Sequence, residues 1–149
     1  MRASSILAAS APLLSLVQAR IGGIGIPSTI KPGDTFNLVI EGEGYIQSVT
    51  DVSIAVGYNP GANPLDYGLG IFITAFDLVA DSNYDGNYNK SVTLPATAQT
   101  GAATFTASLE SLYGVQYEPA LYPFNVSFTI GDATSTDYTF VGLNPPEFS

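Results

Sequence analysis

The sequence predicts an all-β protein: an antiparallel two-sheet sandwich of immunoglobulin-like type. Apolar and polar residues alternate along most of the chain, and no long segment has the helical period. Gly, Pro, Asn and Asp separate the alternating segments, with 15 Gly and 10 Pro among 149 residues. This punctuation allows about seven to nine strands, which is the number expected of a sandwich. An open or closed barrel is the alternative.

The first 19 residues have the three-part pattern of a secretory signal peptide. Arg2 supplies the positive charge, residues 6–17 are apolar or small, and Val17 and Ala19 occupy the cleavage-site positions. The segment is too short for a transmembrane helix, and no other apolar run reaches the roughly 20 residues that a helix needs to cross a bilayer. We therefore expect cleavage after Ala19, secretion and no membrane insertion. A short N-terminal membrane anchor is the alternative.

The rest of the chain predicts one domain over residues 20–142 and a Pro-containing polar tail over residues 143–149. Alternation predicts strands over residues 21–26, 35–41, 45–57 (one bent strand or two short ones), 70–79, 88–94, 102–113 and 122–130, with a last short strand around Tyr138 and Phe140. Turns or loops are expected over residues 27–34, 41–44, 58–69, 80–87, 95–101 and 114–121.

Individual elements have specific sequence signals. Pro32-Gly33 is typical of a type II turn. In the segment 70–79, alternation groups the side chains of Phe72, Thr74, Phe76 and Leu78 on one side. The clearest strand is 122–130, whose predicted inward residues are Tyr122, Phe124, Val126, Phe128 and Ile130.

Two tripeptides fit the N-glycosylation signal of a secreted eukaryotic protein. They begin at Asn89 and Asn125. Asn125 lies between Phe124 and Val126, so strand alternation places it on the outward face, where a glycan would not enter the core.

Composition excludes several classes of protein. With 4 Lys and Arg against 13 Asp and Glu, the formal net charge is −9, which disfavours nucleic-acid binding. The chain has no His and no Cys, so it can form neither a Ser-His-Asp triad nor a thiolate zinc site, and no disulfide holds it together. Carboxylate pairs could be drawn for glycoside hydrolysis, but nothing distinguishes them from surface charge. We expect neither enzyme activity nor a cofactor.

The acidic segment after residue 80 resembles the start of a calcium loop. Asp81, Asn83 and Asp85 have the spacing of the first three oxygen ligands, and Gly86 follows. The twelfth position is Val92 instead of the bidentate Glu, and an acidic solvated turn is the alternative interpretation. We expect no metal site, and this loop is the weak calcium candidate.

Four segments of the chain together form a recognisable pattern. The strongest is Tyr45–Val52, with the sequence Tyr-Ile-Gln-Ser-Val-Thr-Asp-Val, and the others are Ile30–Asp34, Ser111–Gly114 and Tyr122–Ser127. In these segments and in their order, the chain resembles the necrosis-inducing secreted protein family of filamentous fungi, and the likeness extends over about residues 21–138.

The resemblance implies a secreted effector of plant-associated fungi that binds and inhibits plant receptor-associated kinases. Such effectors suppress pattern-triggered immunity and can provoke necrosis, and no enzymatic activity is attributed to the family. The resemblance implies action in the host apoplast or in the host cytoplasm, and we expect a monomer.

The two best-matching segments supply the candidate contact patch. It consists of Tyr45, Gln47, Asp51 and Tyr113, and acidic residues would meet basic ones on the partner. Internal hydrogen bonding of Gln47 and Asp51 is the alternative. Two other functions remain open. The chain could be an extracellular cell-wall or glycan-binding module whose exposed Tyr side chains stack on sugar rings, or a purely structural extracellular protein.

Overall fold

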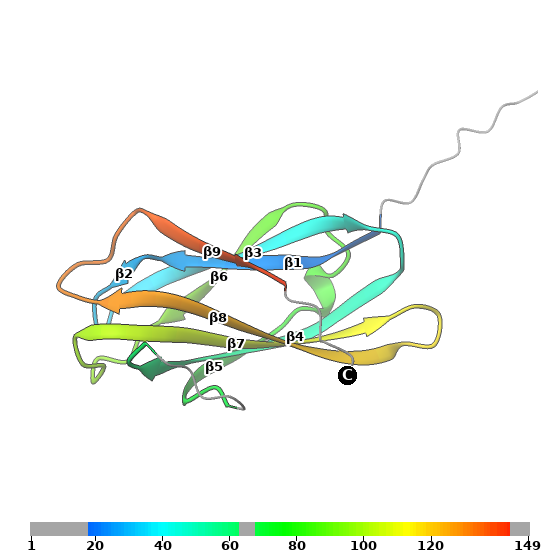
Figure 1. The fold of residues 1–149 in the computed structure, drawn as a ribbon. Helices are drawn as coiled ribbons and strands as arrows, with labels where there is room; N and C mark the ends of the chain where they lie inside the picture. Colours follow the sequence, from blue (N-terminus) through cyan, green and yellow to red (C-terminus); the bar gives the residue numbers. More distant parts are fainter. Residues whose placement is uncertain (1–17, 63–67, 144–149) are drawn as a thin grey trace, which may run out of the picture.

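A computed structural model describes residues 18–62 and 68–143, which form two packed β-sheets (Figure 1). Most of the predicted signal peptide and of the predicted tail lies outside the described residues. Gln18 and Ala19 are the exception, because they form the first two positions of a strand and Ala19 is fully buried. Cleavage after Ala19 stays a prediction, and it would shorten that strand by two residues.

One sheet has the strand order β6-β3-β1-β9, and the other has the order β2-β8-β7-β4-β5. All pairings are antiparallel except β2 with β8, which is parallel. The prediction of an all-β chain with two sheets is therefore confirmed, and the barrel alternative is not observed. The elements are β1 (Gln18–Pro27), β2 (Thr29–Ile30), β3 (Thr35–Tyr45), β4 (Val49–Pro60), β5 (Ile71–Asp77), the 3-10 helix η1 (Val79–Asp81), β6 (Asn87–Thr93), β7 (Gly101–Tyr113), β8 (Glu118–Ile130) and β9 (Tyr138–Gly142).

The core fills the space between the two sheets, and strand alternation selects its residues. All five predicted inward residues of β8 are buried, whereas Asn125 between them is exposed. Phe105 of β7 is fully buried, and its ring meets Phe36 of the opposite sheet edge to face, with 6.1 Å between the ring centroids. Such apolar burial stabilises the fold without any disulfide.

Two predicted loops are shorter than the sequence suggested, and the predicted turn over 41–44 is in the wrong place. β3 continues through residues 41–44, because Glu41 and Glu43 pair with Gly23 and Arg20 of β1, and the turn between β3 and β4 lies at residues 46–48, inside the predicted strand over 45–57. β4 continues to Pro60, so the predicted loop over 58–69 begins too early. β8 begins at Glu118, inside the predicted loop over 114–121. Cross-strand hydrogen bonding extends these strands beyond the point where alternation in the sequence ends.

The segment 27–34 contains both the expected turn and an unexpected strand. The Asp34 amide donates to the Lys31 carbonyl at 3.1 Å and Gly33 has φ +86°, as a type II turn requires. Just before it, Thr29 and Ile30 form β2. Two residues were too few for a detectable alternation.

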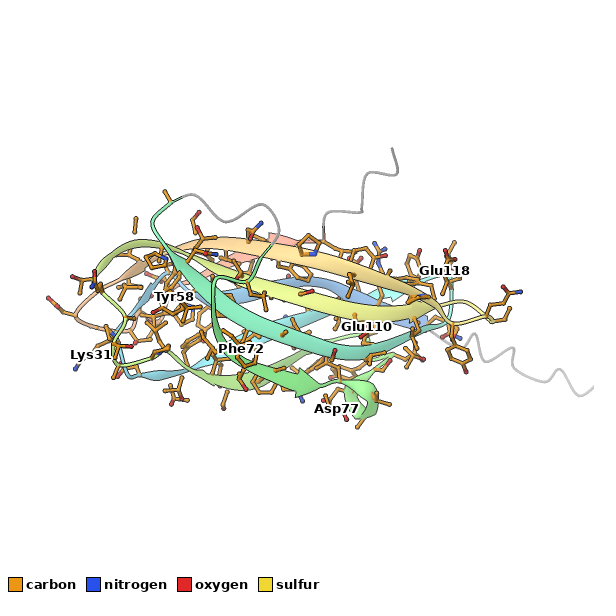
Figure 2. All side chains as sticks on the ribbon, turned by 90° about the horizontal axis from the view of Figure 1, so that it is seen from below. Lys31, Tyr58, Phe72, Asp77, Glu110 and Glu118 are labelled. Carbon is orange, nitrogen blue, oxygen red and sulfur yellow. The ribbon has the colours of Figure 1, made fainter. Side chains whose placement is uncertain are left out.

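The prediction that Phe72 shares one side of the edge strand β5 with Thr74 and Phe76 is wrong. The register shifts between the pairs Val56–Thr74 and Gly57–Phe72, so Ile73 is an extra residue on β5. This bulge turns Phe72 away from the side shared by Thr74 and Phe76, and its side chain is 62% exposed (Figure 2).

Phe105 is buried and Phe72 is exposed, and this difference gives a test of the core. We expect Phe105→Ala to lower the free energy of unfolding by about 3–5 kcal/mol, because it removes a fully buried ring and leaves a cavity. The matched change Phe72→Ala should cost less than about 1 kcal/mol, since most of that ring is already in water. Urea denaturation of both variants measures the difference, and equal losses would contradict this description of the core.

Candidate functional site: a partner-binding tip

Residues from the two best-matching segments, Tyr45–Val52 and Ser111–Gly114, meet at one end of the sandwich. The turn between β3 and β4 and the turn between β7 and β8 lie side by side there, joined by a 2.9 Å hydrogen bond from the Gly114 amide to the Ser48 carbonyl. We call residues 45–48 and 113–118 the tip. Glu118 marks this end in Figure 2, and Lys31 marks the opposite end.

The tip exposes large apolar side chains. Ile46 is 98% exposed, Val115 is 94% exposed and Tyr117 is 61% exposed. Tyr117 also has φ +53°, a left-handed backbone conformation that costs energy in a residue with a bulky side chain. Apolar exposure and backbone strain in adjoining turns are features of interaction sites. Sequence reasoning missed both Ile46 and Val115. Ile46 fell inside the predicted strand over 45–57, so nothing marked it as exposed, whereas Val115 is an apolar residue in a predicted loop, which is a signal that could have identified it.

Buried and half-buried aromatic residues pack together in a cluster beneath the exposed side chains of the tip. The rings of Tyr45 and Tyr113 pack edge to face with 5.9 Å between centroids, and Tyr113 packs against Tyr122 at the same distance. The Arg20 guanidinium lies 4.3 Å from the centroid of the Tyr45 ring and forms a 2.9 Å ion pair with Glu43. Burial, followed by a hydrogen bond with Tyr122, raises the pKa of the Tyr113 hydroxyl, so this group stays neutral. These contacts hold both turns in one arrangement.

The four residues of the candidate patch do not form one surface. Tyr45 and Tyr113 are half-buried in the aromatic cluster, and Gln47 is exposed in the β3–β4 turn. Asp51 is only 2% exposed, and its Oδ1 accepts a 2.7 Å hydrogen bond from Ser111 Oγ. Its position supports the internal hydrogen-bonding alternative. Burial raises the pKa of the Asp51 carboxyl, and the bond from Ser111 opposes that shift.

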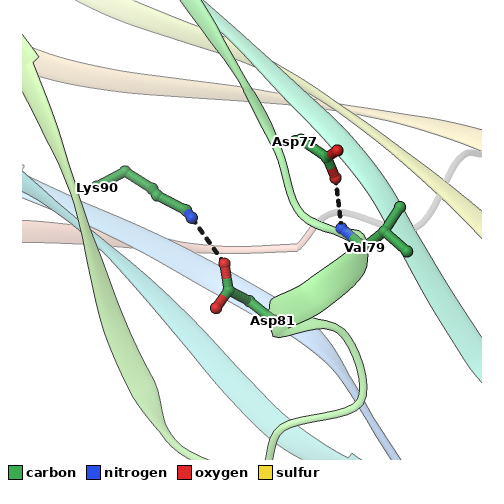
Figure 3. A network of polar contacts seen from close by, with 4 residues as sticks. All are labelled: Asp77, Val79, Asp81 and Lys90. Atoms are coloured by element: carbon green, nitrogen blue, oxygen red, sulfur yellow. Dashed lines mark hydrogen bonds and ion pairs between the residues drawn. The ribbon is translucent and has the colours of Figure 1, made fainter.

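In the candidate calcium loop, two of the three predicted oxygen ligands already accept hydrogen bonds from other parts of the chain. Asp81 Oδ2 accepts a 2.6 Å hydrogen bond from Lys90 Nζ (Figure 3), and Asn83 Oδ1 accepts a 2.8 Å bond from the Ala19 amide. Asp85 is exposed. These bonds join the loop to β6 and β1, so the loop acts as a structural connection between strands.

The remaining candidates are dispersed. Asn89 on β6 and Asn125 on β8 are both exposed, on different sheets. Within residues 18–62 and 68–143, no three His, Cys, Asp or Glu side chains are grouped as metal ligands. Over the same residues, no helix has the length and apolar character needed to cross a bilayer.

Comparison with known proteins shows clear relatives. The model of the Nis1 family matches residues 17–129. Necrosis-inducing secreted protein 1 of Colletotrichum orbiculare is 41% identical over 133 residues, which cover 89% of this chain and 82% of the relative. The protein of the same name in Colletotrichum higginsianum is also 41% identical over 133 residues, which cover 89% of this chain and 92% of that relative. These relatives are secreted proteins by name, and the predicted secreted, extracellular localisation is confirmed.

The buried Asp51 carboxyl predicts an unusual pH dependence. Because its pKa is raised on folding, the native state binds this proton more tightly than the unfolded state does. Ionised Asp51 therefore destabilises the fold at neutral pH, and protonation relieves the penalty as the pH falls through the raised pKa. We expect the free energy of unfolding of the wild type, measured relative to Asp51→Asn, to increase between pH 7 and pH 4.

Urea titrations at several pH values measure this difference. Ser111→Ala should steepen the pH dependence, since it removes the hydrogen bond that favours the ionised carboxylate. A wild-type curve parallel to that of Asp51→Asn would contradict the assignment.

Calcium should not stabilise the chain, because binding would require Asp81 to give up its bond to Lys90, a bond that cleavage after Ala19 leaves in place. We expect the melting temperature to change by less than about 1 °C between a chelator and millimolar calcium. A rise of several degrees with calcium, absent with magnesium, would establish the calcium loop after all.

Proposed function

The chain belongs to the Nis1 family, as the resemblance in its signature segments predicted, and from this premise we propose that it is a necrosis-inducing effector. Its targets are plant receptor-associated kinases, which it binds and inhibits, and it thereby suppresses pattern-triggered immunity. The names of the two relatives support the necrotic activity, since both are called necrosis-inducing. The kinase partner comes from the resemblance alone.

The exposed tip is the observation that carries the binding mechanism. Ile46 and Val115 project almost entirely into solvent, and the underlying aromatic cluster has already fixed the turns that carry them. Inserting two fixed apolar side chains into a partner's pocket removes apolar area from water at little cost in conformational entropy. The net charge of −9 favours a partner whose surface around that pocket is basic.

The tip acts by occlusion, without chemistry. The chain contains no His and no Cys, and the tip carries tyrosine, glutamine and apolar side chains together with Ser48 and the single acid Glu118. Such a surface can cover the substrate-binding or activation region of a kinase. Inhibition then follows from occupancy of the partner and should be reversible.

The strand order supports an immunoglobulin-like assignment of the sandwich. The neighbours β8-β7-β4-β5 on one sheet correspond to strands G, F, C and C′ of that fold, and β6-β3-β1 on the other correspond to E, B and A. The tip then consists of the B–C turn and the F–G turn. In variable domains of antibodies the same two connections contribute to the binding surface.

Introducing charge at the tip tests the proposal. We expect the double variant Ile46→Asp/Val115→Asp to bind the purified cytoplasmic domain of a plant receptor-associated kinase about thirtyfold more weakly than the wild type, because two central apolar contacts are lost. Calorimetry measures the affinity, and infiltration of the secreted protein into leaves measures necrosis and the oxidative burst.

Ala96→Asp is the matched control, because Ala96 is exposed in the turn at the opposite end of the sandwich. It should bind and act as the wild type does. Thermal melting confirms that each variant is folded. A double variant that is folded and fully active would refute the role of the tip, and a wild type with no affinity for any such kinase would refute the proposed partner.

A further inference from the structure

A second surface feature lies away from the tip, on the outer face of the five-stranded sheet. It is a groove of about 500 Å³ between β8 and the backbone of residues 68–69. Leu121 and Pro123 of β8 and Leu69 line its sides, and Ala55 and Ser108 lie between them. Thr106 Oγ1 donates a 2.6 Å hydrogen bond to the Leu69 carbonyl, which holds that side of the groove against the sheet.

Among the residues that the structure describes, no charged side chain lines this groove, although the protein has a net charge of −9. Leu121 is 66% exposed beside it. Leu121 and Pro123 present apolar surface to water there, and a group that covered this surface would be favoured. Asn125 also lines the groove, is exposed, and begins the signal Asn125-Val126-Ser127.

We propose that Asn125 carries an N-linked glycan and that its first N-acetylglucosamine lies in this groove. In the secretory pathway, Asn125 Nδ2 attacks C1 of the first sugar of a lipid-diphosphate-linked oligosaccharide. The bond from Nδ2 to C1 forms, the bond from C1 to the diphosphate oxygen breaks, and the lipid diphosphate departs as Nδ2 loses a proton. No oxidant or reductant takes part.

The chemistry of the sugar matches the groove. One face of a pyranose ring consists of C–H groups, and the N-acetyl group adds a methyl, so both can cover Leu121 and Pro123. The hydroxyl groups remain at the rim, where water solvates them. Covalent attachment at the edge of the groove gives the sugar a high effective concentration, so weak contacts suffice to keep it there.

Asn89 is a matched internal comparison. It lies in the edge strand β6 of the other sheet, opposite Val39, and it is not among the residues that line the groove. A glycan at Asn89 would extend into solvent and cover no comparable apolar surface. The two modification signals therefore predict different consequences for stability.

The experiment uses the full chain secreted from yeast, with Asn89→Gln and Asn125→Gln to isolate each glycan. Peptide mass spectrometry should find a glycan on Asn125. Cutting the glycan back to one N-acetylglucosamine with an endoglycosidase should leave the stability of Asn89→Gln unchanged. Complete removal by an amidase, which hydrolyses the side-chain amide and leaves Asp at position 125, should lower its melting temperature by about 3 °C beyond the effect of the new carboxylate and raise the fluorescence of an apolar-surface dye. The unglycosylated variants Asn89→Gln/Asn125→Asp and Asn89→Gln/Asn125→Gln, compared with each other, report the effect of that carboxylate alone. The same treatment of Asn125→Gln should change neither quantity.

Two outcomes would overturn the inference. An unmodified Asn125 in the secreted protein would remove the glycan, and equal effects of deglycosylation at both sites would show that the sugar does not occupy the groove. Enzymatic removal acts on protein that has already folded and been secreted, so a change in melting temperature reports on the folded state and not on folding in the cell. Neither outcome depends on kinase binding at the tip.

Discussion

Apolar burial between two sheets is the constraint on which the rest of this structure depends. With no Cys available, the strands must be kept in register by their side chains and ladder hydrogen bonds alone. The inward residues of β3, β4, β7 and β8 meet this requirement with large side chains that exclude water, such as Leu38, Ile54, Phe105 and Phe124. A register slip of one residue would turn them to solvent, so the register is fixed, and with it the position of both turns at the tip.

That constraint also explains which parts of the molecule could be predicted from the sequence. The inward residues of β8 follow from alternation, because period 2 is what a half-buried strand imposes on a sequence. The bulge at Ile73 leaves no such trace, since one inserted residue on an edge strand depends on pairing with β4. Tyr45 and Tyr113 were recognised from their segments, but their contact with each other and with Arg20 joins residues far apart in the chain. Burial of Asp51 is likewise a product of packing.

The tip and the groove both expose apolar side chains to water, but they differ in shape. At the tip, Ile46 and Val115 stand in turns that the aromatic cluster and the Gly114–Ser48 hydrogen bond keep fixed, and they are fully accessible to a partner. In the groove, the apolar side chains form a recess beside a residue that can be modified. A protruding surface suits a partner with a pocket, whereas a recess suits a small covalently attached group. The shape of each region therefore limits what it can bind.

Two kinds of interaction contribute to recognition by this molecule. One is the long-range attraction that its net charge produces, and the other is contact by the apolar side chains of the tip. Acidic residues outnumber basic ones by 13 to 4, and Arg20 and Lys90 are engaged in ion pairs with Glu43 and Asp81. The net negative field acts over about a Debye length of 10 Å and can orient the protein toward a basic surface before contact. Ile46 and Val115 carry no charge, so burying these two side chains in a partner does not itself desolvate an ionised group. Long-range attraction, to which Glu118 of the tip itself contributes, thus accelerates the encounter, and short-range apolar burial determines how long the complex lasts.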